Sequence, residues 1–154
     1  MLFLMFQLGR DRYVLDTSQV EAVLPLLAVK QLPAAPKGVA GAISYRGTPV
    51  PVIDLSLLAL GRPATPALSK RIILLHYPAQ SGAPRLLGLI AERAIETITR
   101  DPTDFVASGV EAGMPPYLGP VAADEAGLVQ WIRAEALLPP EIRDILFRQL
   151  TAEP

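Results

Sequence analysis

The chain has 154 residues, of which 51% are hydrophobic and 19% are charged, and its formal net charge is −1. A chain of this length buries roughly two-thirds of the surface that its unfolded form exposes, which is enough for one core without covalent or metal staples. It contains no cysteine and one histidine, which excludes disulfides, thiolate chemistry and multi-histidine metal sites. The balanced charge gives no electrostatic signature for nucleic acid or an anionic membrane, and 16 prolines argue against a helical bundle.

The start of the chain does not have the pattern of a targeting signal. Residues 1–8 are largely apolar, but they lack the basic start and the small-residue cleavage site of a secretory signal peptide. Charged residues interrupt every apolar stretch before it reaches the roughly 18 residues of a membrane span. We therefore expect a cytoplasmic protein that does not insert into a membrane.

Short apolar runs bounded by Gly, Pro, Asp and Ser recur along the chain and predict a fold built mainly from short strands. Residues 3–8 are apolar on both faces, which predicts a buried first strand. The polar residues 9–12 predict a tight turn, and residues 13–16 the returning arm of a hairpin.

A helical turn and a stiff connector are expected next. Thr17 or Ser18 can cap a short helical turn that carries Val20 and Val23 on one side, facing the core. Two prolines within residues 32–36 fix the backbone there, which predicts a connector that cannot enter a helix interior.

Residues 39–45 and 48–55 predict two strands joined by a tight turn. Pro49 and Pro51 both remove N–H donors from the same side of the second strand, which places at least part of it at a sheet edge. The proline-containing segment 62–70 is the clearest loop and the predicted boundary between two lobes of a single domain, with strands exchanged between the lobes as an open alternative.

Four more strands, a loop and a C-terminal helix are predicted after residue 70. Further strands are expected at residues 71–77, 86–91, 94–99 and 128–132. Residues 101–127 are rich in Gly, Pro and Ala and are expected to be mostly loop. Residues 140–150 begin with proline and carry an apolar stripe, which predicts one short C-terminal helix.

The sequence contains few residues suited to catalysis and no motif for a cofactor site. No glycine-rich phosphate loop is present, and His76 lies in an apolar strand without a serine-elbow pattern, so a hydrolase that uses His76 has little support. Arg46 and Gly47 form the turn between two apolar strands. There the guanidinium can reach a partner's carboxylate or carbonyl, although an ordinary exposed turn arginine accounts for the same pattern.

An ordered series of short motifs runs through residues 3–55. They are Phe6-Gln7-Leu8-Gly9, Tyr13-Val14-Leu15-Asp16, Leu32-Pro33-Ala34-Ala35-Pro36, Gly38-Val39-Ala40-Gly41-Ala42-Ile43, Tyr45-Arg46-Gly47 and Pro49-Val50-Pro51-Val52-Ile53-Asp54-Leu55. No single motif is specific, but their order resembles the CheW family of chemotaxis coupling proteins. Weaker agreement follows at Leu87-Gly88-Leu89-Ile90 and at residues 128–138.

This resemblance implies two small SH3-like five-stranded β-barrels packed together, without catalytic activity or a cofactor. It implies an adaptor that joins the cytoplasmic tips of chemoreceptors to the regulatory domain of a CheA-type histidine kinase, at membrane-associated receptor arrays. By the same resemblance, the expected partner-binding residues are Arg46, Gly47, Val20, Gly41 and Gly88. The alternative is an SH3-like module that binds a peptide or a small molecule outside such an array.

The sequence departs from the family pattern at several places. Ala22 stands where the family often has an acidic residue, and Ser44 where asparagine is common. Ala91-Glu92 replaces a Val-Asp pair, and residues 101–127 align poorly. These departures suggest a specialised member that serves surface sensing, pili or development rather than swimming.

Overall fold

The structure is a computed structural model that describes residues 1–25, 29–31, 35, 38–56, 70–78, 85–107, 115–139 and 143, without the side chains of 93–95. Its strands are β1 (Leu2–Leu8), β2 (Asp11–Asp16), β3 (Val20–Pro25), β4 (Val39–Tyr45), β5 (Thr48–Asp54), β6 (Lys70–Tyr77), β7 (Arg85–Thr99), β8 (Leu118–Asp124) and β9 (Gly127–Ile132). Three short 3-10 helices are η1 (Thr17–Gln19), η2 (Pro102–Asp104) and η3 (Ala134–Ala136). The described part of the chain is therefore mainly β, as predicted.

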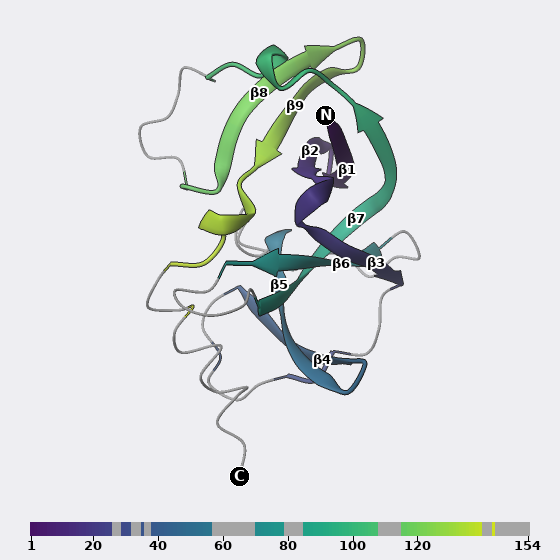
Figure 1. The fold of residues 1–154 in the computed structure, drawn as a ribbon, viewed down its shortest axis with the longest axis vertical. Coiled ribbons are helices and arrows are strands. Elements are labelled where there is room, and N and C mark those ends of the chain that lie inside the picture. The colour runs from purple at the N-terminus through teal and green to yellow at the C-terminus, as the bar shows by residue number, and fades with distance from the viewer. Residues whose placement is uncertain are drawn as a thin grey trace.

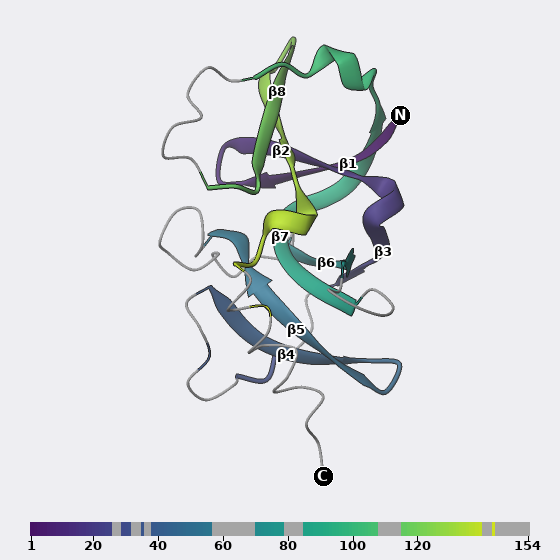
Figure 2. The same ribbon diagram turned by 60° about the vertical axis from the view of Figure 1, so that its left-hand side comes forward.

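The strands pair in the order β3-β6-β7-β1-β2-β9-β8, and the β4–β5 hairpin joins this sheet through parallel pairing of β5 with β7. The 15-residue strand β7 links two lobes (Figures 1 and 2), because residues 85–92 pair with β6 and its later residues pair with β1. We call the set β1, β2, β8, β9 and late β7 the β1 lobe, and the set β3, β4, β5, β6 and early β7 the β4 lobe. Each lobe has five strands, in agreement with the predicted pair of barrels.

The buried apolar side chains form three clusters that follow this arrangement. One cluster in the β1 lobe includes Phe3 and Val14, and one in the β4 lobe includes Ile72 and Leu74. The third and largest cluster draws residues from both lobes. Its members include Leu4, Phe6, Leu8, Ile53, Leu55, Ile73, Leu75, Leu87 and Ile132.

The third cluster explains the continuous apolar runs in the sequence. Along β6, Ile72 packs inside the β4 lobe while its neighbour Ile73 packs in the shared cluster, and both side chains are fully buried. Successive side chains of a strand point to opposite faces, so a strand that lies between two clusters must be apolar on both. The same alternation on β1 confirms that the first strand is buried on both faces.

The structure also agrees with the predicted edge position of Pro49 and Pro51. Strand β5 pairs with β4 along its length, but with β7 only over Val52–Asp54. Among the described residues, the first half of β5 therefore has a strand on one side only. The missing proline N–H groups leave no gap in a hydrogen-bond ladder there.

The predicted helical turn with Val20 and Val23 on one side is wrong. A single 3-10 turn ends at Gln19, and its cap is Asp16, whose Oδ1 accepts a hydrogen bond from the backbone N–H of Ser18 at 2.9 Å, rather than Thr17 or Ser18. Val20 begins β3, which pairs with β6. The six residues of β3 are too few to separate helical from strand periodicity, so pairing with the apolar β6 decides the outcome.

The expectation that residues 101–127 are mostly loop is wrong for β8. Gly119 and Pro120 suggested a loop, but they lie in an irregular stretch of β8, where the pairing with β9 shifts between Leu118 and Val121. A Cβ atom at Gly119 would lie 2.8 Å from the backbone oxygen of Trp131. Glycine is thus required by the close approach of β9, not by a turn.

Two other predictions fall on residues that the structure does not describe. Apart from Arg143, residues 140–150 of the predicted C-terminal helix lie outside the described ranges, as do residues 62–69 of the predicted lobe boundary. Lys70 is the first residue of β6.

Candidate functional site

The β4–β5 hairpin presents Arg46 and Gly47 at its tip. Tyr45 and Thr48 are paired, so these two residues form the whole turn, and both have positive φ, 50° and 81°. Two central residues with φ > 0 are the signature of the type I′ turn, whose twist matches that of a hairpin. Arg46 is the one residue other than glycine with positive φ in the described part of the chain.

The side chain of Arg46 is exposed and lies over its neighbouring aromatic ring. Its guanidinium carbon is 5.2 Å from the centroid of the Tyr45 ring, a cation–π distance. Within the described residues Arg46 makes no ion pair. The tip therefore holds an oriented cation whose hydrogen-bond donors remain available.

Gly41 shapes the base of this hairpin rather than its surface. It is buried, has a φ of 148° and marks a shift in the pairing of β4 with β5. A Cβ atom here would lie 2.0 Å from the backbone oxygen of Lys30, which pairs with Ala42 through two backbone hydrogen bonds of 2.8 and 2.9 Å. Gly41 thus lets the segment at Lys30 approach β4.

Val20 lies at the start of β3, which is the strand at one end of the pairing order of the sheet. It is partly buried and packs against the shared cluster, whereas Val23 on the same strand is 38% exposed. Glu21 is exposed, and its Oε1 lies 3.1 Å from Nε2 of His76 on β6. His76 is therefore exposed and faces a carboxylate on the neighbouring strand β3.

Gly88 lies on β7 inside the β4 lobe and is buried. A Cβ atom there would meet side-chain carbons of Val52 and Ile72 at 3.0 and 3.2 Å. The five residues expected to bind partners thus all belong to the β4 lobe. Arg46 and Gly47 are exposed, Val20 is partly buried, and Gly41 and Gly88 are buried.

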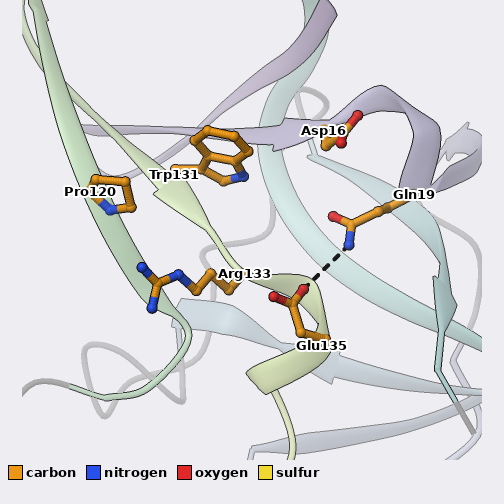
Figure 3. A pocket seen from close by; sticks show the side chains of 6 residues that line it. All are labelled: Asp16, Gln19, Pro120, Trp131, Arg133 and Glu135. Atoms are coloured by element: carbon orange, nitrogen blue, oxygen red, sulfur yellow. Dashed lines mark hydrogen bonds between the residues drawn. The ribbon is translucent and has the colours of Figure 1, made fainter. Parts of the chain in front are cut away.

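The structure brings together a pocket that sequence reasoning missed (Figure 3). It has a volume of about 270 Å³ and is lined by Asp16, Gln19, Pro120, Trp131, Arg133 and Glu135. Gln19 Nε2 donates a hydrogen bond of 3.3 Å to Glu135 Oε2, while the Arg133 side chain extends toward β8. These residues come from η1, β8, β9 and η3 and their flanks, so no local pattern in the sequence could have grouped them.

Neither a cluster of metal ligands nor a membrane-spanning helix is found among the described residues. No group of three or more His, Asp or Glu side chains there is placed to hold a metal ion. Among the described residues, no helix has the length and apolar character that a membrane span requires.

Comparison with known proteins places this fold in a family. The model of the CheW-like domain family matches residues 2–141, nearly the whole chain. The chain belongs to this family. CheW-like proteins are scaffolds of chemotaxis, so the match supports the resemblance seen in the motif series of residues 3–55.

Individual relatives of this CheW-like protein agree. The chemotaxis protein CheW of Rhizobium meliloti (strain 1021) is 24% identical over 144 residues, which cover 90% of this chain and 88% of the relative. The crystal structure of the scaffolding protein TtCheW from Thermoanaerobacter tengcongensis matches with a TM-score of 0.75 and 22% identity, covering 86% of this chain and 83% of that chain. At this identity the structural likeness shows a shared fold.

Proposed function

We propose that this CheW-like protein is a non-enzymatic adaptor that couples the cytoplasmic tips of chemoreceptors to a CheA-type histidine kinase in a chemotaxis-like array. The match of the family over residues 2–141 supports an adaptor role. Through these two partners, the protein would reside in the cytoplasm at membrane-associated receptor arrays.

The observation that carries the proposal is the conformation of Arg46. A left-handed conformation costs a residue with a Cβ atom about 1–2 kcal/mol, and glycine, asparagine or aspartate adopts it more readily. Here an arginine occupies this position with its charge exposed and oriented over Tyr45. Backbone strain that is retained at an exposed turn supports a role in binding rather than in folding.

We assign different roles to the five candidate residues. Arg46 would form bidentate hydrogen bonds to a carboxylate of the partner, with Gly47 allowing its backbone to approach the turn. Val20 would contribute apolar contact at the edge formed by β3. Gly41 and Gly88 would act through the packing of the β4 lobe, since both are buried.

The substitution Arg46→Asn tests this assignment. Asparagine tolerates the positive φ, so the melting temperature should stay unchanged or rise, while affinity for the purified kinase regulatory domain or for a receptor-tip fragment should fall at least tenfold. Isothermal titration calorimetry measures the affinity with each partner. Arg10→Asn is the matched control, because Arg10 is an exposed turn arginine of the β1–β2 hairpin in the other lobe.

Retention of both affinities in Arg46→Asn would remove Arg46 from the interface. If the wild-type protein itself fails to co-elute with the kinase regulatory domain and with the receptor tip, the adaptor proposal fails. A peptide- or small-molecule-binding module outside an array would then be the better description.

A further inference from the structure

The pocket of Figure 3 lies where strands of the β1 lobe meet η1 and η3. Its volume of about 270 Å³ is slightly below the roughly 300–1,000 Å³ of drug-sized ligand sites, so it suits a ligand with the size of one amino acid. None of the five residues assigned to partner binding lines it. A ligand in this pocket would therefore be additional to the proposed protein partners.

Charged side chains of opposite sign line this pocket without pairing. Figure 3 shows the Arg133 guanidinium beside Pro120 of β8, whereas Asp16 and Glu135 lie on the other side of the pocket, at η1 and η3. Among the described residues, Arg133 forms no ion pair with either carboxylate. A ligand that carries both an anionic and a cationic group can satisfy opposite charges that are held apart across one pocket.

The position of the Arg133 side chain depends on the absence of a side chain at Gly119. A Cβ atom at Gly119 would lie 3.3 Å from Nε and 3.5 Å from Cγ of Arg133, so the arginine lies directly against β8. The backbone N–H of Arg133 also donates to Tyr117 O at 2.8 Å. Glycine thus leaves room for the arginine stem, which places the guanidinium on one wall of the pocket.

Hydrogen bonds hold the two carboxylates on the opposite wall and leave each of them an oxygen for a ligand. Asp16 accepts from Ser18 N through Oδ1 at 2.9 Å. Glu135 accepts from Gln19 Nε2 through Oε2 at 3.3 Å, and its backbone oxygen lies 3.2 Å from the Tyr77 hydroxyl. No hydrogen bond within the described residues uses Asp16 Oδ2 or Glu135 Oε1, so both can accept from an ammonium group.

Trp131 supplies an apolar surface in the same pocket. Its indole is partly buried and packs against Phe3 and Phe105, with ring centroids 4.9 and 5.2 Å apart, which fixes its orientation. Pro120 adds a second stiff apolar surface to the lining. The ring and the proline favour a ligand whose charged groups are joined to an apolar side chain.

We propose that this pocket binds a free α-amino acid with an apolar side chain. The α-carboxylate accepts hydrogen bonds from the Arg133 guanidinium, the α-ammonium donates to Asp16 and Glu135, and the side chain packs on Trp131. A ligand with only a cation leaves Arg133 unpaired, and a ligand with only an anion brings its charge near two carboxylates. The pocket therefore selects the zwitterion, and this small-molecule function does not depend on the adaptor role.

Titration with L-leucine and two of its analogues tests the proposal. Trp131 is the single tryptophan of the chain, so its fluorescence reports on the pocket, and none of the three ligands fluoresces. Isocaproate lacks the ammonium group of leucine, and isoamylamine lacks the carboxylate. We expect saturable binding of L-leucine and about tenfold weaker binding of each analogue, because each one loses hydrogen bonds between charged groups.

Two variants test the assigned contacts separately. Arg133→Gln should weaken L-leucine binding about tenfold but should not weaken binding of isoamylamine, which has no carboxylate. Glu135→Gln keeps an oxygen that can accept from Gln19, and it should weaken binding of L-leucine but not of isocaproate. Arg10→Gln, at an exposed turn arginine of the same lobe, is the control and should bind all three ligands as the wild type does.

Three results would overturn the proposal. The first is no saturable binding of L-leucine, and the second is an analogue that binds as tightly as L-leucine. The third is a loss of affinity in Arg133→Gln that is as large for isoamylamine as for L-leucine, since a contact to the carboxylate cannot affect a ligand without one.

Discussion

At the scale of single residues, the strongest charged contact described in the chain is the pair of Arg12 and Asp124. The guanidinium of Arg12 on β2 donates to both carboxylate oxygens of Asp124, at 2.8 and 2.6 Å. Asp124 also accepts from the backbone N–H of Ala126 at 2.9 Å, which ties the turn between β8 and β9. This bidentate geometry links the two ends of the β1 lobe across more than one hundred residues of sequence.

This pair predicts a specific pH dependence. The hydrogen bond from Arg12 lowers the pKa of Asp124 to about 2. Because the folded-state pKa lies below the unfolded value, the stabilisation is fully present above pH 4 and is lost as the pH falls toward 2. The Asp124 side chain is 32% exposed, so the contribution is at most about 1 kcal/mol.

Thermal melts of wild type and Asp124→Asn at a series of pH values measure this effect. The difference in melting temperature should be constant between pH 5 and 7 and should shrink below pH 4. Asp104→Asn, at an exposed residue of η2 whose nearest contact with Arg100 is 3.6 Å, is the control and should show a smaller difference at neutral pH. A difference between wild type and Asp124→Asn that persists unchanged at pH 2 would contradict the assigned cause.

At the scale of elements, the β4–β5 hairpin contains two glycines whose replacement by alanine should have different costs. A Cβ atom at Gly47 would meet nothing within 4 Å, so Gly47→Ala adds only the strain of a positive φ, about 1 kcal/mol. Gly41→Ala adds the same kind of strain and a clash with the backbone of Lys30 at 2.0 Å. We expect Gly41→Ala to lower the free energy of unfolding by about 3 kcal/mol or more.

Urea denaturation of both variants measures the two costs. Because both substitutions replace glycine by alanine in one hairpin, their difference isolates the close approach of the Lys30 segment. Equal losses of stability in Gly41→Ala and Gly47→Ala would show that this segment moves away at little cost.

The elements also show which parts of the fold can be predicted from sequence. The hairpins of β1–β2 and β4–β5 were predictable because their turn residues and apolar arms are neighbours in the chain, and β6 because it is apolar on both faces. Strands β3 and β8 could not be predicted in this way, because the strand that each one pairs with decides its conformation. Gly119 illustrates this, because its close contact is with Trp131 on another strand.

The candidate functional residues also divide into those that the sequence indicates and those that only the structure brings together. The positions of Arg46 and Gly47 follow from a local turn, so the sequence was enough to single them out. The pocket of Figure 3 joins residues of β8 and β9 to residues at η1 and η3, and their proximity is a property of the packed structure alone. No pattern of residue types reports such a group.

At the scale of the whole molecule, the two lobes are joined by more than a linker. Strand β7 pairs in both lobes, and the largest apolar cluster takes fully buried side chains from β1 and β6 together. Separating the lobes would expose that cluster to water, at about 25 cal/mol for each Å² of apolar surface. The lobes should therefore unfold as one cooperative unit.

The single tryptophan of the chain allows this to be tested. Trp131 packs against Phe3 and Phe105 in the β1 lobe, with ring centroids 4.9 and 5.2 Å apart, so its fluorescence reports on that lobe. Far-UV circular dichroism reports on the strands of both lobes, and we expect the two signals to give the same urea midpoint. Gly41→Ala, which damages the β4 lobe alone, should shift the Trp131 midpoint as far as the circular dichroism midpoint. An unshifted Trp131 transition in that variant would mean that the β1 lobe folds without its neighbour and that the shared cluster contributes little to cooperativity.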